Sequence, residues 1–551
     1  MSSIVSHHRT DAQIDRVFAT FEGLLGIAET FLAKQRYRQA AVSAEIAALY
    51  ASYNHPGQFA SPRLERLLRI IGHRTVDDSA MACGRGTPDG TIRRVLHVLT
   101  AAKDVGGDSR FVWRWIQRDV ERCHSVALTS QLDFDVPAPL VEAVAERHGR
   151  VHVLDRERTP SVQRAQALRR IARDADVVFL HVYPEDVVPT IAFADKTELP
   201  PIVFVVQADH QFWVGVSVAD LFVHLRESGE RLSETRRGVD RSKIVRLPIP
   251  LDAKVAQASK AAAKKAVGLS EDTVVMLSIA RSVKYEPIES ARHFAEVLTP
   301  ILNKYRNAVL FVVGPSNENQ WKAAGQRTDG RIRVLGERSD TAGLYEAADI
   351  YLDSFPFSSN TSLLEAGSFG VPLVTYFPYS AEAAVLGAGS PGLDANLIRA
   401  DNLEDYRANV SRLIEESSFR AKVGQLTGSD ITLRHVGNNW NKALESMYLT
   451  VVCSVPKAET NDTADESRAE ELDLLLNRYY SRHVPLEWVI GWYARDLPYR
   501  LRRQLLFEML RFSRSFAFSM FLPDWIRKSV GGRLRGWRRL PVVAHWLAAR
   551  G

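Results

Sequence analysis

The chain has 551 residues, with 71 Lys and Arg against 65 Asp and Glu, and its formal net charge is +6. Because 46% of the residues are hydrophobic and 25% are charged, the composition is that of an ordinary globular protein. It excludes a collagen-like chain, a mainly disordered chain and a disulfide scaffold. The length predicts about three or four structural units.

The positive charge is concentrated at the C-terminus. Residues 496–551 hold 12 basic and three acidic residues, a net charge of +9, so the other 495 residues sum to −3. This distribution argues against a nucleic-acid-binding domain that fills the chain. The three cysteines, Cys83, Cys123 and Cys453, form no CxxC motif and favour a reducing, cytoplasmic location. We predict no transmembrane helix, because the uncharged run 366–381 is broken by Gly and Pro. We predict no signal peptide, because the N-terminus has no apolar core.

Residues 1–90 are predicted to be a helical accessory region. Apolar residues recur at helical spacing from Ile14 to Leu25 and again from Leu64 to Ile71. A packing appendage is the favoured interpretation, and a surface for self-association is the alternative.

Two series of alternating strands and helices follow. Residues 91–250 carry β-branched runs with amphipathic stretches between them, and Pro248 and Pro250 end this unit. The predicted strands are 94–100, 124–129, 150–154, 176–182, 201–206, 220–225 and 243–247. Residues 251–455 repeat the pattern. The predicted strands are 273–280, 308–313, 332–335, 349–352 and 372–375. The predicted helices are 288–305, 340–348 and 361–370, and more helix is predicted between 403 and 448. The fold class is therefore α/β, with two tandem doubly wound sheets facing a cleft and ligands beyond the carboxyl ends of the strands.

A polar helix entrance follows the predicted strand 349–352. Backbone N–H groups and the positive end of the helix dipole would bind an anion there, and the hydroxyls add donors. Glu365, roughly one turn into the helix, could accept hydrogen bonds from a ribose diol. An ordinarily capped helix is the alternative. The entrance residues are Ser358, Ser359, Asn360, Thr361 and Ser362.

The segment 349–357, DIYLDSFPF, with the downstream residues Asn360-Thr361, Leu364-Glu365-Ala366 and Gly370-Val371-Pro372, resembles the donor-binding segment of GT-B glycosyltransferases. The likeness is to bacterial relatives of the O-linked N-acetylglucosamine transferases and to the large retaining hexosyltransferase group. It extends over about residues 91–450 and is strongest over 273–376. It implies the GT-B fold, with an acceptor domain at 91–250 and a nucleotide-sugar donor domain at 251–455.

The resemblance also implies roles for single residues. Thr361 and its neighbours would hold the diphosphate, and Glu365 the ribose. Arg281 and Lys284, just after the first strand of the second domain, match the basic residues that neutralise the leaving diphosphate, although a solvated surface pair is the alternative. Residues 334–338 match the region that recognises the base. Retaining members carry two glutamates eight positions apart, and Phe357 stands at the first of these positions, which favours inversion.

The first domain is expected to supply acceptor contacts and the general base. Gly106 and Gly107 follow its first strand and resemble the glycine loop of these enzymes, with a tight βα turn as the alternative. His210, oriented by Asp209, is the first candidate for the base, and His181 at the end of another strand is the rival. A structural histidine that caps a helix is the alternative for His210.

No metal and no cofactor are expected beyond the donor. Asp133 and Asp135 form an Asp-x-Asp pattern that binds manganese in a different glycosyltransferase fold, but such a short pattern is common by chance. The sequence has no HExxH, GxSxG or Walker motif, and no zinc-type cluster of Cys and His residues.

Residues 456–551 are predicted to form an acidic linker and a basic amphipathic tail. On a helix over 500–516 the apolar and the basic side chains fall on separate arcs, and tryptophans and further arginines follow. This pattern is typical of a helix on an anionic membrane surface, with packing on the protein body and nucleic-acid binding as alternatives. The apolar residues are Leu501, Leu505, Met509, Phe512 and Phe516, and the basic ones are Arg500, Arg503, Arg511 and Arg514.

These features predict a metal-independent glycosyltransferase of the hexosyltransferase class that uses a UDP-sugar rather than a GDP-sugar. The expected acceptor is a hydroxyl of a glycan, a lipid-linked saccharide or a protein, in the synthesis of a surface polysaccharide or glycoconjugate. The protein would be cytoplasmic and peripheral on the inner membrane face, with nucleic acid unlikely as a partner. A non-catalytic GT-B scaffold and a nucleotide-sugar epimerase are the alternative functions.

Overall fold

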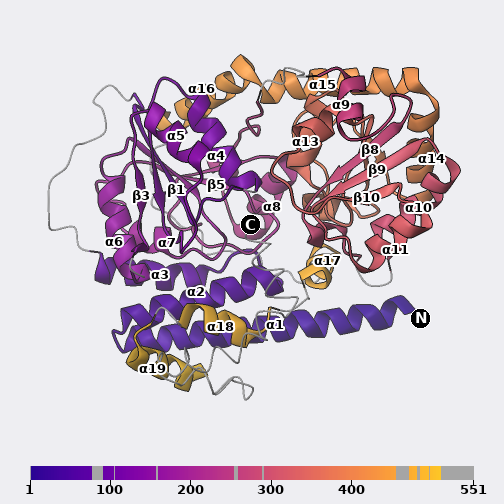
Figure 1. Ribbon diagram of the computed structural model, residues 1–551. Coiled ribbons are helices and arrows are strands. Elements are labelled where there is room, and N and C mark those ends of the chain that lie inside the picture. The colour runs from indigo at the N-terminus through magenta and orange to yellow at the C-terminus, as the bar shows by residue number, and fades with distance from the viewer. Residues whose placement is uncertain are drawn as a thin grey trace. The chain divides into compact units, whose positions relative to one another are not determined.

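The computed structural model describes residues 2–76, 91–104, 106–156, 159–252, 258–287, 291–453, 471–480, 484–494 and 497–509. It divides into two compact units (Figure 1). The first unit comprises residues 1–224, 229–245 and 447–551, and the second comprises 225–228 and 246–446, as far as these ranges are described.

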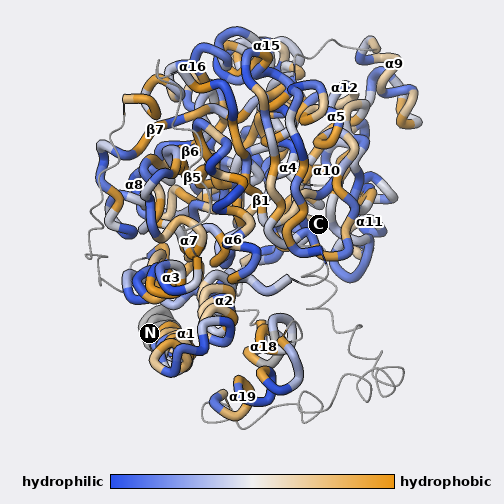
Figure 2. The backbone as a smooth tube through the Cα atoms, turned by 90° about the vertical axis from the view of Figure 1, so that its left-hand side faces the viewer, coloured by the Kyte–Doolittle hydropathy of each residue, from blue (hydrophilic) through white to orange (hydrophobic). Residues whose placement is uncertain are grey.

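Three helices open the first unit: α1 (Ser2–Ala33), α2 (Tyr37–Asn54) and α3 (Pro62–Thr75). Ser61 caps α3 by accepting a hydrogen bond from the backbone N–H of Leu64, and Pro62 fits the first turn because its missing N–H would have no partner there. Helix α3 lies beside α7 (Val188–Ala192), and both Figure 1 and Figure 2 show this pairing. The helices of residues 2–75 therefore share one hydrophobic core with the first sheet.

The first sheet has seven strands in the order β3-β2-β1-β4-β5-β6-β7. The strands β1 to β6 are paired in parallel, so their carboxyl ends meet at one edge. The order of the strands reverses between β1 and β4, which is the point where doubly wound sheets bind their ligands. The strands are β1 (Arg94–Leu99), β2 (Cys123–Leu128), β3 (Val151–Val153), β4 (Val177–His181), β5 (Ile202–Val206), β6 (Leu221–His224) and β7 (Ile244–Arg246), and the remaining helices are α4 (Gly107–Arg118), α5 (Ala138–Glu146), α6 (Ser161–Ala172) and α8 (Glu227–Arg237).

The second unit contains a six-stranded parallel sheet in the order β10-β9-β8-β11-β12-β13. Its reversal point lies between β8 and β11. Both predicted parallel sheets are thus confirmed. The strands are β8 (Val274–Ile279), β9 (Ala308–Val313), β10 (Ile332–Val334), β11 (Ile350–Leu352), β12 (Leu373–Tyr376) and β13 (Ile398–Ala400), and the helices are α9 (Lys260–Ala266), α10 (Phe294–Lys304), α11 (Asn319–Arg327), α12 (Ala342–Ala347), α13 (Asn360–Ser368), α14 (Leu403–Glu415) and α15 (Ser417–His435).

Two local predictions for the second unit differ from the structure. The helix predicted over 288–305 begins only at Phe294, because the ring of His293 caps it by accepting from the backbone N–H of Ala295. Strand β13 was not predicted, because its three residues give no alternating pattern long enough to read.

The C-terminal segment begins with α16 (Gly437–Cys453) and continues with α17 (Glu471–Tyr480), α18 (Leu486–Ala494) and α19 (Tyr499–Met509). Helix α18 contacts α2, and α19 contacts both α1 and α2. Leu505, Leu506 and Met509 of α19 are buried in the same core as Phe21. The apolar face predicted for 500–516 is therefore packed on the protein as far as Met509, whereas Arg500 and Arg503 are exposed. Phe512, Phe516, the later tryptophans and the acidic stretch 457–470 lie outside the described residues. Among the helices that the structure describes, none has the length and apolarity needed to cross a bilayer.

Candidate functional site

In the second unit, two loops meet at the reversal point of the sheet. One follows β8 and carries Arg281 and Lys284, and the other follows β11 and leads into α13. The ammonium group of Lys284 donates a hydrogen bond to the carbonyl oxygen of Ser358, with 2.7 Å between Nζ and O. It also lies 4.8 Å from the centre of the Phe357 ring. The structure thus places Lys284 beside the predicted anion site, while Arg281 is exposed at the start of the same loop.

A buried carboxylate shapes the loop between β11 and α13. Asp353 accepts hydrogen bonds from the backbone N–H of Ser359 and from the hydroxyl of Thr375, at 2.9 Å each. Burial raises the pKa of Asp353, whereas these hydrogen bonds and the nearby charge of Lys284 act in the opposite direction. Asp353 was not among the predicted site residues, although an acid directly after a buried strand is a signal that could have identified it.

The entrance of α13 is only partly available to a ligand. The cap residue Ser359 makes no side-chain hydrogen bond to the first N–H groups of the helix. Its hydroxyl lies 3.2 Å from that of Ser362. The Asn360 side chain, which was predicted to bind the donor, instead donates to the carbonyl oxygen of Gly387 and accepts from Gly389 and Ser390. Its amide therefore anchors the 387–390 loop, and donor binding by Asn360 stays a prediction.

The remaining donor-site candidates lie at the first two turns of α13. Ser358 is buried, and Thr361 is half-buried at the second position of the helix. Glu365 is buried one turn further on, where its Oε2 accepts a hydrogen bond of 3.3 Å from the hydroxyl of Tyr345. Because a carboxylate oxygen can accept more than one hydrogen bond, this contact orients the group and leaves its chemistry suited to a diol.

In the first unit, the corresponding reversal point lies between the loops after β1 and β4. The hydroxyl of Thr100 donates to Asp186 and accepts from the backbone N–H of Tyr183, which ties the two loops together. Gly106 precedes α4 with a φ of 134°, a backbone conformation that L side chains rarely adopt. Gly107 is the first residue of α4. The glycine pair therefore lies after β1 at the reversal point, and its role in binding a ligand stays a prediction.

The two candidate bases end different strands. His181 is the last residue of β4, at the reversal point, and it is buried. His210 lies in the turn after β5, where its Nδ1 is 3.3 Å from Oδ1 of Asp209. Its side chain is 15% exposed, so it keeps access to solvent, and the Asp209 carboxylate is positioned to orient it as predicted.

A third histidine near this turn was missed. His224 ends β6 and is fully buried, and a Cβ atom added at Gly229 would meet both Nδ1 of His224 and Oδ2 of Asp209. Burial lowers the pKa of His224 to about 4, and the Asp209 charge partly offsets that effect. The signal for it, a histidine at the end of a buried strand, is the same as for His181.

The two Rossmann-like sheets, each with its polar loops at a reversal point, define the GT-B class of glycosyltransferase folds. Residues 273–416 match the family model Glycosyl transferases group 1. The resemblance inferred from the sequence is thereby confirmed.

One of the similar solved structures supports this class at the level of the fold. A glycosyltransferase from Rickettsia africae is 12% identical, with a TM-score of 0.50 over 65% of this chain and 99% of its own. Anabaena Alr3699/HepE, solved in complex with UDP and glucose, is 14% identical, with a TM-score of 0.49 over 65% of this chain and 100% of its own. The Thermobaculum terrenum O-GlcNAc transferase is 15% identical, with a TM-score of 0.47 over 82% of this chain and 84% of its own. No curated protein matches the sequence significantly.

Proposed function

We propose that the chain transfers a sugar from a nucleoside-diphosphate donor, with a UDP-sugar as the first candidate, to a hydroxyl group of a glycan, lipid-linked or protein acceptor. The observation that supports this most directly is the contact of Lys284 with Ser358. It holds a cation beside the N-terminus of α13, at the point where a doubly wound sheet binds its ligand.

Three groups of the donor site have different roles. The first N–H groups and the dipole of α13 attract the diphosphate, because both present positive charge at the helix N-terminus. Lys284, with Arg281 in the same loop, stabilises the negative charge that develops on the diphosphate as it leaves. Glu365 accepts hydrogen bonds from the ribose hydroxyls.

We propose that the transfer inverts the anomeric carbon and needs no metal ion. Phe357, rather than a carboxylate, occupies the position at which the retaining relatives contact the donor sugar, and its ring packs under Lys284. The acceptor oxygen then attacks directly and needs a base. His181 and His210 are the candidates, and both lie at the carboxyl edge of the first sheet.

The proposed setting is the synthesis of a surface polysaccharide or other glycoconjugate, at the cytoplasmic face of an anionic membrane. Residues 510–551 carry nine basic residues and one acidic residue, together with three tryptophans. Basic and aromatic side chains together favour the surface of an anionic bilayer.

The experiment is a donor screen with the full chain. UDP-glucose, UDP-galactose, UDP-N-acetylglucosamine and GDP-mannose are incubated with the protein, and the released nucleoside diphosphate is measured with water or added sugars as acceptor. Release of UDP supports the proposal. Binding of UDP without turnover would indicate a non-catalytic scaffold, and interconversion of the sugars without release would indicate an epimerase. Absence of both binding and release would reject the enzyme.

A further inference from the structure

Three histidines form a diagonal line across the first sheet. His97 lies in the middle of β1, with Val95 two residues before it and Leu99 two residues after it. Val95 pairs with His124 on β2, and Leu99 pairs with His181 on β4. Because side chains two residues apart point to the same face, all three rings lie on one face of the sheet. The line runs from the amino end of β2 to the carboxyl end of β4.

The rings are joined by hydrogen bonds. Nε2 of His181 lies 3.0 Å from Nδ1 of His97, and Nε2 of His97 lies 3.0 Å from Nδ1 of His124. At the carboxyl edge, Nδ1 of His181 lies 3.5 Å from the amide nitrogen of Gln207, a half-buried residue directly after β5. A continuous series of hydrogen-bonded nitrogen atoms therefore connects the carboxyl edge of the sheet, where the acceptor is proposed to bind, with the opposite edge.

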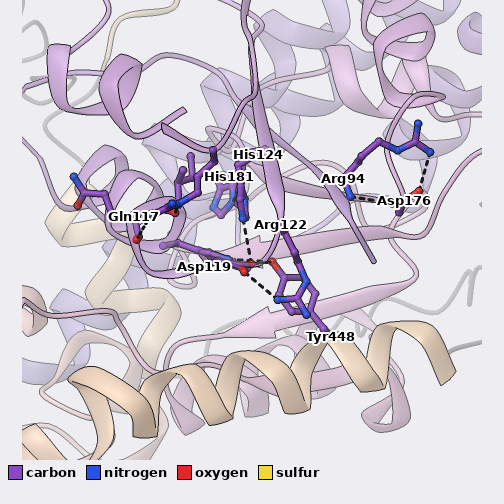
Figure 3. Close-up of polar contacts among 12 residues, drawn as sticks. Arg94, Gln117, Asp119, Arg122, His124, Asp176, His181 and Tyr448 are labelled. Carbon is purple, nitrogen blue, oxygen red and sulfur yellow. Dashed lines mark hydrogen bonds and ion pairs between the residues drawn. The ribbon is translucent and has the colours of Figure 1, made fainter. Parts of the chain in front are cut away.

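Asp119 closes the chain at the opposite end (Figure 3). Its Oδ2 lies 3.2 Å from Nε2 of His124, within ion-pair distance but without the geometry of a hydrogen bond. The same oxygen accepts a hydrogen bond of 2.7 Å from the hydroxyl of Tyr448. Its Oδ1 accepts from Arg122 at 3.0 Å. Burial raises the pKa of Asp119, but the contacts with His124, Arg122 and Tyr448 outweigh it, so the pKa is lowered and the group is ionised at neutral pH.

Aromatic side chains enclose the histidines. Trp115 of α4 packs against both His97 and His181, Phe111 packs against His181, and Phe179 of β4 stacks on His97. Among the described residues, the charged group in contact with the three histidines is Asp119, which is itself bound by Arg122 and Tyr448. Burial lowers the pKa of His181 to about 3, and burial together with the neighbouring rings lowers that of His97, so both rings are neutral at pH 7.

The ionised Asp119 carboxylate determines which nitrogen donates and which accepts in each hydrogen bond between the histidines. It can only accept a proton, so Nε2 of His124, which faces it, carries one; in the resting state that we propose the ring holds no second proton, and Nδ1 is bare. The bare Nδ1 accepts from Nε2–H of His97, whose own Nδ1 then accepts from Nε2–H of His181. The result is that His181 presents an unprotonated Nδ1 toward Gln207 and the reversal point between β1 and β4.

We propose that Asp119, His124 and His97 form a proton relay that makes His181 the general base toward the acceptor hydroxyl, a role that rests on the proposed glycosyl transfer. His181 is the catalytic residue of this relay, and the other three are positioning residues.

The step balances as follows. The acceptor oxygen bonds to the anomeric carbon, the bond from that carbon to the diphosphate oxygen breaks, and its electron pair leaves with the diphosphate. The acceptor proton passes to Nδ1 of His181, the Nε2 proton of His181 passes to Nδ1 of His97, and the Nε2 proton of His97 passes to Nδ1 of His124. The positive charge comes to rest on His124, which is as buried as His97 but lies 3.2 Å from the Asp119 carboxylate, and that carboxylate stabilises the charge. The reverse transfers return the proton to solvent after the product leaves.

The first test needs no substrate and stands even if no transfer activity is found. In the full chain labelled with 15N-histidine, NMR at pH 7.5 reads the tautomer of each ring, with histidine-to-glutamine variants for assignment. We expect a proton on Nε2 and none on Nδ1 for His97, His124 and His181. A proton on Nδ1 of His181 would overturn the proposal.

The second test uses Asp119→Asn, which keeps the shape and removes the charge. The probe is hydrolysis of UDP-glucose, in which water replaces the acceptor. We expect kcat to fall at least about 10-fold with KM unchanged. The acidic limb of the pH profile should move to lower pH, because the protonated relay has lost its stabilising carboxylate.

The matched control is Asp176→Asn, which removes a buried carboxylate bonded to the backbone and guanidinium of Arg94, outside the relay (Figure 3). An Asp119→Asn enzyme with the wild-type rate and pH profile would overturn the relay. If wild-type protein releases no UDP from any donor, the proposed function fails and the tautomers alone decide the relay.

Discussion

Lys284 and Ser358 are joined across the reversal point of the second sheet, where the ammonium group of one donates to the carbonyl oxygen of the other at 2.7 Å. The two residues are 74 positions apart in the chain and follow the neighbouring strands β8 and β11. This contact fixes a positive charge next to the start of α13. Two elements that each attract an anion weakly are thereby brought to one place.

Lys284→Met should lower kcat for UDP release about 100-fold, because loss of one preorganised donor to a developing anion has that order of effect. Methionine keeps an apolar stem over the Phe357 ring, so the main loss is the charge. The control is Lys304→Met, at an exposed position on α10 that pairs with Glu415. Wild-type kcat in Lys284→Met would contradict the assignment. Melting temperatures of both variants separate a binding effect from a folding effect.

Glu365→Gln should raise KM for UDP-sugars about 10-fold and change kcat little, because hydrogen bonds to a charged acceptor contribute about 1.5–3 kcal/mol. Glutamine keeps the volume and can still accept from Tyr345. The comparison variant is Glu404→Gln, at an exposed position in the first turn of α14. Initial rates over a range of donor concentrations give both constants. An unchanged KM would remove Glu365 from the donor site.

The positions of Lys284 and Glu365 could be predicted because their sequence signals are local. A β-branched run predicts a strand such as β8 or β11, and basic or hydroxyl residues directly after it must lie at its carboxyl end. The parallel pairing then brings the two loops together. The contacts of Asn360 could not be predicted, because its partners lie on the 387–390 loop, whose position no local pattern reveals.

The histidine chain lies beyond such local reasoning. His97, His124 and His181 each fall in or beside a predicted strand, and each alone resembles an ordinary buried histidine. Their alignment depends on the strand order β2-β1-β4 and on a register that pairs Leu99 with His181. Neither is encoded in the spacing of the three residues along the chain, so the relay became visible only in three dimensions.

The buried neutral state of His181 predicts a pH-dependent stability. Its folded pKa of about 3 lies below the unfolded value of about 6.5, so between these values the unfolded state binds more protons. The free energy of unfolding is therefore highest above about pH 6.5, as far as this group decides it, and falls as the pH drops below that value. Between pH 7.5 and pH 5.5, the free energy of unfolding of the wild type should decrease by about 1.4 kcal/mol more than that of His181→Gln. Urea unfolding at both pH values measures this, with His73→Gln, at an exposed position on α3, as the control. Equal losses in wild type and His181→Gln would contradict it.

Metal chelation should leave UDP release unchanged, because Lys284 and the N-terminus of α13 supply the positive charge that a manganese ion supplies in other enzymes. The measurement compares the rate before and after EDTA, with a manganese-dependent transferase in parallel to show that chelation is complete. The variants Asp133→Asn and Asp135→Asn, both at exposed positions after β2, should also release UDP at the wild-type rate. Loss of activity with EDTA and its return with manganese would reject metal independence.

Truncation after Met509 should abolish binding to anionic vesicles and leave the fold intact. Leu505, Leu506 and Met509 are packed in the core with α1 and α2, so a truncation before them would expose that core. The removed residues 510–551 carry a net charge of +8, and each basic side chain near an anionic surface contributes about 1 kcal/mol. Co-sedimentation with phosphatidylglycerol vesicles, and with phosphatidylcholine vesicles as the uncharged control, measures the effect. The full chain should bind only the anionic vesicles, and less at high salt because the attraction is screened. If the truncated protein binds them as tightly as the full chain, residues 510–551 are not a membrane address.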